Sequence, residues 1–193
     1  MKFQKILVAS FVCGIALTLN AQKTVAPPPK PTDSGPSLAA TMQFLQEKLN
    51  GIGKVSFVSF QHNTTSGEDN INTFTEEVTN VIADANQCRI TFHWKATRDG
   101  ATMSDIDAGV PLRDAQDVVI EPLAQNLNEV NAAAGNPNLI ASSTNPPLTA
   151  LLVRRPHGGV NFFPFTDSQL ADRVAKAMTH AIELCGGGNK DPF

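Results

Sequence analysis

Two cysteines are the residues of this 193-residue chain whose chemistry depends most on where the protein resides. Cys88 and Cys185 remain if a leader that carries the third cysteine, Cys13, is removed. Two separated thiols in an exported chain favour a disulfide, whereas a reactive thiol or a metal pair is the alternative. The chain has no Cys-x-x-Cys spacing. We therefore predict a disulfide between Cys88 and Cys185.

One spacing resembles part of a metal site. His180 and Glu183 are three residues apart and share one side of an expected helix, an arrangement that helical metal sites use. The chain lacks the His-Glu-x-x-His motif and a second histidine at helical spacing. A solvated surface pair explains these two residues better than a metal site does, and we expect neither a metal nor a cofactor.

Carboxylates occur in two close pairs, but neither spacing identifies a catalytic dyad. Asp105 and Asp107 share one face of an expected strand, whereas Glu76 and Glu77 lie on opposite faces of another. Solvent-exposed strand acids explain both pairs. The chain also lacks the Gly-x-Ser-x-Gly, Ser-x-x-Lys and phosphate-binding-loop motifs. We therefore predict no catalytic residue.

The densest basic group and a run of phenylalanines lie close together near the C-terminal helix. Arg154 and Arg155 precede an expected turn at residues 157–159, and such a group suits anion capture, although solvated surface charge explains it too. Three phenylalanines follow in an expected strand and cannot all face one way, so some must meet a helix, a loop or a partner. We predict an interaction surface here, with coverage by the N-terminal helix as the alternative; its residues are Phe163, Phe165, Arg154 and Arg155.

The first 21 residues have the organisation of a secretory signal peptide. Lys2 and Lys5 precede an apolar run at residues 6–19, and the segment ends on Ala21. The run is shorter than the roughly 20 apolar residues of a membrane span, and no small residue precedes Cys13 as a lipoprotein would require. We expect cleavage after Ala21, a secreted or periplasmic protein, and no transmembrane anchor in the mature chain.

Composition limits the partners of the mature chain. Residues 22–193 have the length of one domain, and the loss of two leader lysines takes the formal charge from −3 to −5. Because nucleic acids and anionic lipids are bound by clustered Lys and Arg, neither is an expected partner. Residues 22–36 contain five prolines and little apolar content, which predicts a disordered or extended tether before the domain.

Two amphipathic helices are expected at the ends of the domain. In residues 37–50 an apolar stripe recurs at helical spacing, namely Leu38, Met42, Leu45 and Leu49. In residues 167–185, Thr166 and Gln169 are spaced as a capping box. Three glycines end this helix, and residues 188–193 are expected to fray. Its expected apolar face comprises Leu170, Val174, Ala177, Met178, Ala181 and Cys185.

Between these helices the period changes from helical to alternating, which predicts strands within residues 54–165. The clearest places Ile90, Phe92 and the only tryptophan, Trp94, on one apolar face, so Trp94 is expected in the core. Another places Phe74, Val78 and Ile82 together. Residues 124–147 follow neither period and are expected to form a long insertion loop. The seven predicted strands span residues 54–61, 72–84, 88–97, 103–110, 118–122, 148–155 and 160–165.

The order of these elements resembles a known fold family. Four strands before Leu112, three after it and a closing helix resemble the PH-like sandwich of PH and GRAM domains, over about residues 54–185. The resemblance implies a single α+β or mainly β domain at residues 37–187: a seven-stranded antiparallel sandwich with a C-terminal amphipathic helix and an extra N-terminal helix. Phosphoinositides bind PH domains at a basic loop between the first two strands. Residues 62–70 contain no Lys or Arg there, so no phosphoinositide is expected.

A second resemblance bears on the compartment. Residues 175–193 and the Arg98-Asp99-Gly100 turn are similar to those of a family of uncharacterised secreted bacterial proteins. Taken with the absence of catalytic motifs, these features predict a secreted or periplasmic, non-catalytic binding or interaction module. An envelope-associated structural or assembly protein is the alternative, and a small hydrolase is a more distant one. An apolar cleft in the structure would favour the binding module. A large apolar face or an open sheet edge would favour the assembly protein.

Overall fold

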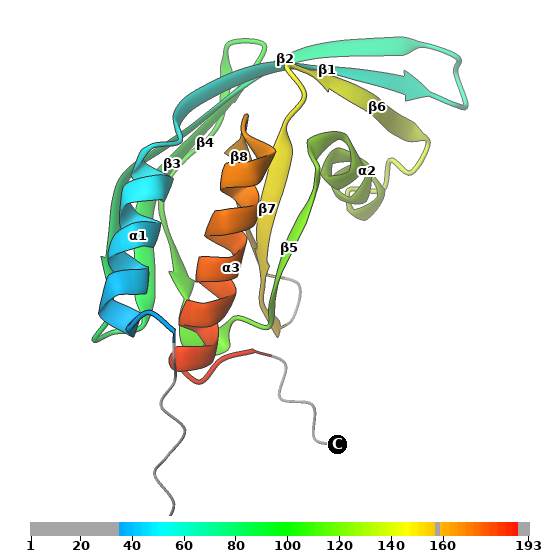
Figure 1. Ribbon diagram of the computed structural model, residues 1–193. Helices are drawn as coiled ribbons and strands as arrows, with labels where there is room; N and C mark the ends of the chain where they lie inside the picture. Colours follow the sequence, from blue (N-terminus) through cyan, green and yellow to red (C-terminus); the bar gives the residue numbers. More distant parts are fainter. Residues whose placement is uncertain (1–34, 157–158, 189–193) are drawn as a thin grey trace, which may run out of the picture. The chain divides into compact units, whose positions relative to one another are not determined.

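A computed structural model describes residues 35–156 and 159–188 of the chain (Figure 1). The expected signal peptide, most of the expected tether, two residues of the turn at 157–159 and nearly all of the expected tail lie outside these residues. The described chain has mixed α+β architecture. It contains three α-helices, one short 3-10 helix and eight strands in two antiparallel sheets.

The larger sheet is a four-stranded meander with one added strand. Its order is β4-β3-β2-β1-β6, and the meander consists of β1 (Gly53–Asn63), β2 (Asp69–Asp84), β3 (Arg89–Arg98) and β4 (Ala101–Pro111). Asp99 and Gly100 join β3 to β4 with φ of 50° and 81°. Positive φ at both positions is what a two-residue hairpin with the right strand twist requires, so the predicted turn is confirmed.

The segment predicted as a long loop is instead ordered as a helix and a strand. It contains most of α2 (Leu123–Ala133) and all of β6 (Leu139–Asn145), which pairs with β1. The side chain of Asn128 donates to the Ala141 carbonyl at 3.1 Å and accepts from its N–H at 2.5 Å. Leu123, Leu127 and Val130 recur at helical spacing along α2, so this helix carried a periodic signal that the prediction missed. The described residues therefore form eight strands rather than the predicted seven.

The smaller sheet has the order β5-β7-β8. It is formed by β5 (Asp117–Pro122), β7 (Thr149–Arg154) and β8 (Val160–Phe165), and the 3-10 helix η1 (Leu112–Asp114) joins β4 to β5. The central strand β7 is buried on both faces, so its sequence is a continuous apolar run rather than an alternation. Four successive side chains of β7 are at most 1% exposed, namely Ala150, Leu151, Leu152 and Val153.

Two helices cover the core, and both differ slightly from prediction in what they bury. Helix α1 (Leu38–Asn50) begins at the Ser37 cap and buries most of its predicted stripe. Helix α3 (Ser168–Leu184) is capped by Asp167 instead of the predicted Thr166. The Asp167 carboxylate accepts hydrogen bonds from the backbone N–H groups of Gln169 and Leu170. Its buried face is Ala171, Val174, Ala175, Met178, Ala181 and Ile182.

A bulge changes the face of one predicted core residue. The register between β2 and β3 shifts between Thr79 and Ile82, and Asn80 adopts a φ of 54°. The extra residue reverses the alternation beyond this point. Val81 therefore enters the core at 3% exposure, whereas Ile82, which was predicted to face inward, is 60% exposed.

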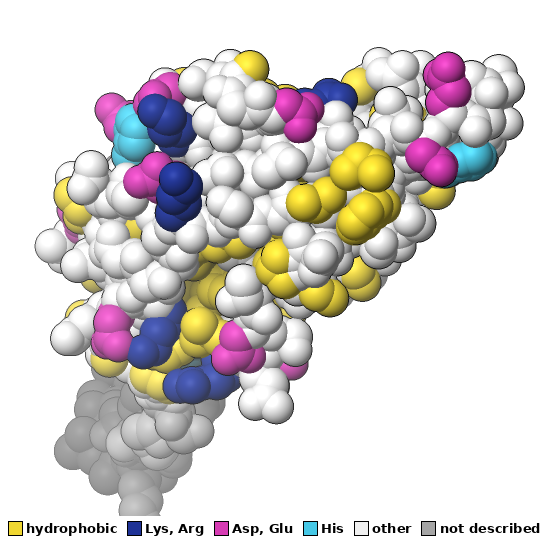
Figure 2. Space-filling view, turned by 90° about the horizontal axis from the view of Figure 1, so that it is seen from above, with side chains coloured by type: hydrophobic (Ala, Val, Ile, Leu, Met, Phe, Trp, Pro, Cys, Tyr) yellow, Lys and Arg dark blue, Asp and Glu magenta, His cyan; other side chains and the backbone are white. Residues whose placement is uncertain are grey.

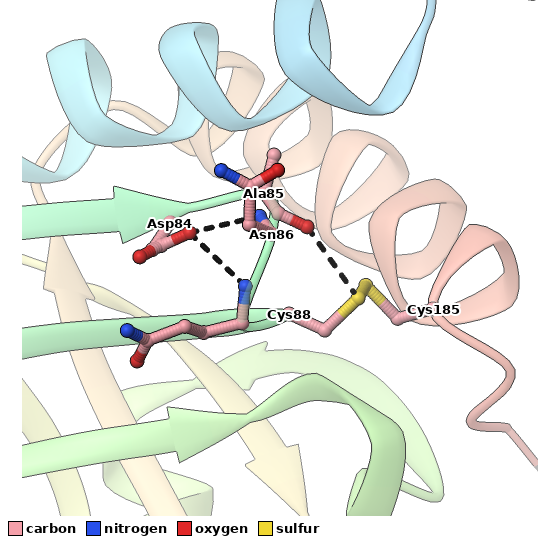
Figure 3. Close-up of a disulfide and its surroundings, with 6 residues drawn as sticks. Asp84, Ala85, Asn86, Cys88 and Cys185 are labelled. Carbon is pink, nitrogen blue, oxygen red and sulfur yellow. Dashed lines mark hydrogen bonds between the residues drawn. A yellow bond between two sulfur atoms is a disulfide. The ribbon is translucent and has the colours of Figure 1, made fainter.

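Cys88 and Cys185 form a disulfide, as the sequence predicted, with Cα atoms 5.7 Å apart (Figure 3). The bond joins the residue before β3 to Cys185, the residue that follows α3. In the turn before Cys88, the Asp84 carboxylate accepts from the N–H groups of Asn86 and Gln87 at 2.8 and 3.0 Å. Beyond α3, Gly188 donates to the Ala115 carbonyl at 2.8 Å, so the first residue of the expected frayed tail is held against the domain.

Candidate ligand-binding cleft

A cleft of about 410 Å³ lies between the two sheets, where β4 and β8 form their respective edges. Small-molecule sites have volumes of roughly 300–1,000 Å³, with mostly apolar walls and a few polar groups. This cleft has such a volume, and six of its nine lining residues are apolar, although polar atoms contribute almost half of its surface. Its lining residues are Phe92 and Trp94 from β3, Ile106, Ala108 and Gly109 from β4, Arg155, and Val160, Asn161 and Phe162 from β8.

One wall is the inner face of β3 and β4. Phe92 lies opposite Ala108 and Trp94 lies opposite Ile106, and directly opposed residues of an antiparallel pair project from the same face. Strand alternation directs Ile106 toward the interior, yet it is 49% exposed. The smaller sheet therefore leaves this end of the inner face uncovered.

The opposite wall is the edge of β8. Three consecutive residues line the cleft there, namely Val160, Asn161 and Phe162. Because successive strand residues point to opposite faces, only the edge of the strand can present all three. Val160 is exposed at this edge. In the described part of the chain, β4 and β8 are each paired with a neighbouring strand on one side only. Both of these edge strands border the cleft.

Two residues that line the cleft each have a polar atom without a partner. The Nε of Arg155 and the Oδ1 of Asn161 are buried, and neither has a hydrogen-bond partner within the described part of the chain. Over the same residues Arg155 forms no ion pair. A buried polar atom without a partner costs roughly 1–3 kcal/mol. A ligand group that pairs with such an atom therefore gains more binding free energy than it would from an atom that water already solvates.

A buried acid holds the tryptophan of the cleft in place. The Nε1 of Trp94 donates to Glu76 Oε2 at 2.6 Å. Glu76 is 8% exposed, and burial raises its pKa to about 7 against the opposing effect of the Trp94 hydrogen bond. The sequence had explained Glu76 as a solvent-exposed strand acid, which is wrong. Glu76 shares its parity with Phe74 and Val78, and this inner face of β2 is covered.

Two residues of the predicted interaction surface do not lie at the surface. Phe163 and Phe165 are buried at 0% and 3% exposure, and the ring of Phe163 lies 5.0 Å from that of Phe92. They are core residues, because α3 packs against β8 and both rings belong to the main core cluster. Alternation along the strand showed that Phe162 faces the other way, but not which side of β8 would be covered.

The two arginines of the predicted surface separate. Arg154 extends toward α2, where its Nη2 lies 3.5 Å from Glu129 Oε2. Arg155 instead lines the cleft, and its backbone N–H donates to the Gly159 carbonyl at 2.7 Å. Sequence reasoning missed Asn161 and Ile106 as cleft residues. Strand parity placed Ile106 correctly, but only the packing of the second sheet shows that this residue stays uncovered.

The other candidate residues for chemistry lie apart from the cleft. On the outer face of the larger sheet, His93 lies between Asp105 and Asp107 at 3.0 Å from each, and chiefly the Asp107 hydrogen bond raises its pKa. His180 donates to the Pro36 carbonyl at 2.9 Å. Over the described ranges, no three His, Cys, Asp or Glu side chains are placed to hold a metal ion. No helix in these ranges is both long and apolar enough to cross a membrane.

A second hollow of about 440 Å³ lies between α1 and α3. Its apolar part includes Phe44 and Ala177, and cations border it, with Arg173 at 5.7 Å from the centre of the Phe44 ring. Pro36 also lines this hollow, so the chain continues from it directly into residues that the structure does not describe. The cleft between β4 and β8 is taken as the candidate site because two of its lining residues, Arg155 and Asn161, each have a buried polar atom without a partner among the described residues.

No protein-family model matches this chain, and neither a curated protein nor a solved structure was found to be similar to it. Its function must therefore be inferred from the geometry of the described residues, and among these the cleft between β4 and β8 combines apolar walls with polar atoms that lack partners.

Proposed function

We propose that this protein is exported and acts as a non-catalytic binding module whose ligand occupies the cleft between β4 and β8. The observation that carries the proposal is the pair of buried, unpartnered polar atoms of Arg155 and Asn161 within apolar walls. Apolar walls supply affinity, while a few fixed polar groups orient a ligand.

The energetics of the cleft favour an amphipathic ligand. Ile106 and Val160 are large apolar side chains left about half exposed at its mouth. Covering them contributes about 25 cal/mol for each Å² of apolar surface removed from water. A ligand that also supplies an anionic acceptor to the Arg155 guanidinium gains a charge-assisted hydrogen bond.

Two further parts of the proposal concern compartment and fold family. Export to the periplasm or the cell exterior is supported by the leader at residues 1–21 and by the disulfide, since such bonds persist in oxidising compartments. A PH-like fold is supported by the meander β1–β4, followed by the sheet β5-β7-β8 and the closing helix α3. In this proposal α2 and β6 are additions to the seven-stranded arrangement.

Fluorescence of Trp94 tests the binding function directly. Because the chain has one tryptophan and no tyrosine, intrinsic fluorescence reports on the cleft. Titration with the aromatic anion 1-anilinonaphthalene-8-sulfonate should show saturable energy transfer from Trp94 with one bound probe. Ala108→Phe fills the cleft and should abolish the transfer. Ala101→Phe, at an exposed position of the same strand, is the matched control and should leave it unchanged.

Circular dichroism and unfolding midpoints of both variants show whether they remain folded. A folded Ala108→Phe variant that binds the probe like the wild type argues against the cleft as the site. A wild type without saturable binding argues against the proposed function itself.

An envelope-associated assembly protein is the alternative that a specific observation favours. Phe60 lies opposite Ile71 on the outer face of β1 and β2, and Ile140 of β6 lies opposite the next outward residue of β1, His62. All three apolar side chains are exposed, and hydrophobic side chains gather on the face seen in Figure 2. We call Phe60, Ile71 and Ile140 the outer patch. Contiguous exposed apolar patches are typical of protein interfaces.

A further inference from the structure

We propose, on the basis of the proposed binding function, that the cleft recognises an α-carboxylate that adjoins an N–H donor and an apolar side chain. Two sources share this chemistry. One is a free N-acylated apolar amino acid, and the other is the C-terminal residue of an extended peptide.

The carboxylate follows from Arg155. A guanidinium offers N–H donors only, in a planar fork that matches the two oxygens of a carboxylate. The Nε of Arg155 is buried without a partner, and no acidic side chain of the described residues pairs with this arginine. The neighbouring Arg154, by contrast, already faces Glu129. The uncompensated cation in the cleft is therefore complementary to an anionic ligand group.

The N–H donor follows from Asn161. Its Oδ1 is an acceptor, and it too is buried without a partner among the described residues. Asn161 lies opposite Val153, and the Arg155 N–H bonds to the Gly159 carbonyl two positions further along the ladder. Arg155 and Asn161 thus share one face of this pair of strands, about 7 Å apart along it. The long Arg155 side chain covers that separation, so both groups can serve adjacent atoms of one ligand.

The apolar side chain follows from the opposite wall. Phe92, Trp94 and Ile106 offer two aromatic rings and a branched aliphatic group. The Glu76 hydrogen bond fixes the indole of Trp94, so this wall is arranged before a ligand arrives. A preorganised wall lowers the entropic cost of binding.

The edges of the two sheets distinguish the two sources. β4 and β8 are terminal strands in the sheet orders of the described chain. An extended peptide gains main-chain hydrogen bonds by pairing with such an edge, whereas a free acylated amino acid gains at most those of one residue. A peptide C-terminus is therefore expected to bind more tightly if the strand edges take part.

The test compares acids with amides on neighbouring arginine variants. The ligands are N-acetyl-L-leucine, an acetylated Ala-Ala-Ala-Leu peptide with a free C-terminus, and the C-terminal amide of each, measured by calorimetry and Trp94 fluorescence. Each free acid should bind at least tenfold more tightly than its amide. Arg155→Gln should remove this preference, and Arg154→Gln is the matched control that should keep it. Asn161→Leu should weaken N-acetyl-L-leucine but not 4-methylpentanoate, which has no N–H.

The outcomes separate the two proposals. A peptide acid that binds tenfold more tightly than the acetylated amino acid assigns the ligand to a chain terminus, and equal affinities assign it to a free acid. Equal binding of acids and amides, or an acid preference that persists in Arg155→Gln, overturns the carboxylate inference. So does failure of all four ligands while 1-anilinonaphthalene-8-sulfonate still binds. Loss of binding to that probe as well counts against the proposed function instead.

Discussion

Glu76 is a carboxylic acid on the inner face of the larger sheet, among residues that are mostly apolar. Its one hydrogen-bond partner among the described side chains is the indole N–H of Trp94. Burial disfavours the charged form and raises the pKa of Glu76 to about 7. The acid that orients the cleft tryptophan therefore changes its protonation state near neutral pH, well above the usual range of a carboxylic acid.

We expect wild-type stability to fall as pH rises from about 4.5 to about 7. In this window the unfolded state releases the Glu76 proton while the folded state keeps it, so folding becomes less favourable with rising pH. The effect is at most about 3 kcal/mol between pH 4 and pH 8. Glu76→Gln keeps an acceptor for Trp94 but cannot ionise, so its stability should fall less. Urea unfolding at several pH values measures the free energy of unfolding of the wild type and of the Glu76→Gln variant.

The control for this titration is Glu77→Gln, on the opposite face of the same strand. It should retain the wild-type pH dependence, because Glu76 is still present. If wild type and Glu76→Gln lose stability in parallel between pH 5 and pH 8, burial of Glu76 does not govern the pH dependence.

At the scale of elements, α3 is tied to the rest of the domain at its C-terminal end. The disulfide joins the end of α3 to the residue before β3, and Gly188 bonds to the segment after η1. Gly187 between them lies so close to the Leu112 carbonyl oxygen that a Cβ atom would clash with it. The glycines after α3 therefore do more than end the helix, because they let the chain pass close to η1.

Removal of the disulfide should lower stability substantially. The bond closes a loop between residues separated by 97 positions, and a loop of that length limits the entropy of the unfolded chain by about 4–5 kcal/mol. The double variant Cys88→Ala with Cys185→Ala should lose up to this amount in urea unfolding. Reduced wild type should resemble the variant, and the variant itself should not respond to reductant. A wild type whose stability is the same after verified reduction would contradict this expectation.

At the scale of the whole molecule, the cleft and the outer patch lie on opposite faces of the larger sheet. The cleft uses the inner face of β3 and β4, whereas the outer patch uses the outer face of β1, β2 and β6. Because different strands carry them, binding in the cleft and association through the patch can be tested separately.

The assembly alternative predicts concentration-dependent association through the outer patch. Ile71 is 64% exposed within it, so Ile71→Lys should shift the sedimentation of the protein toward the monomer. Ile82→Lys is the matched control, since Ile82 is 60% exposed on the same strand but outside the patch. A wild type that sediments as a monomer at every concentration excludes self-association through this patch and leaves the proposed binding function unaffected.

Local sequence determined most elements of this protein. Strands with one covered face alternate in polarity, and α1 and α3 repeat their apolar residues at helical spacing, so each pattern depends only on near neighbours along the chain. The two cysteines that remain after the expected leader similarly predicted their own pairing. The α2–β6 segment was not predicted, although Leu123, Leu127 and Val130 recur at helical spacing in α2. The contacts of Asn128 and Asn131 with the backbone of β6 have no counterpart in such a local pattern.

Only the tertiary structure decided which faces are covered. Alternation separated Phe162 from Phe163, yet it did not show which of them faces the interior. It gave Glu76 the parity of the apolar residues Phe74 and Val78, but this parity did not show that a carboxylic acid would be buried there. That assignment depends on how two sheets and two helices pack, and hence on contacts between residues far apart in the sequence. The same packing buries Phe163 and Phe165, encloses Glu76 beside Trp94, and leaves Ile106 uncovered. The cleft exists because the smaller sheet does not extend over the end of the larger one, and no local pattern in the sequence encodes where a second sheet ends.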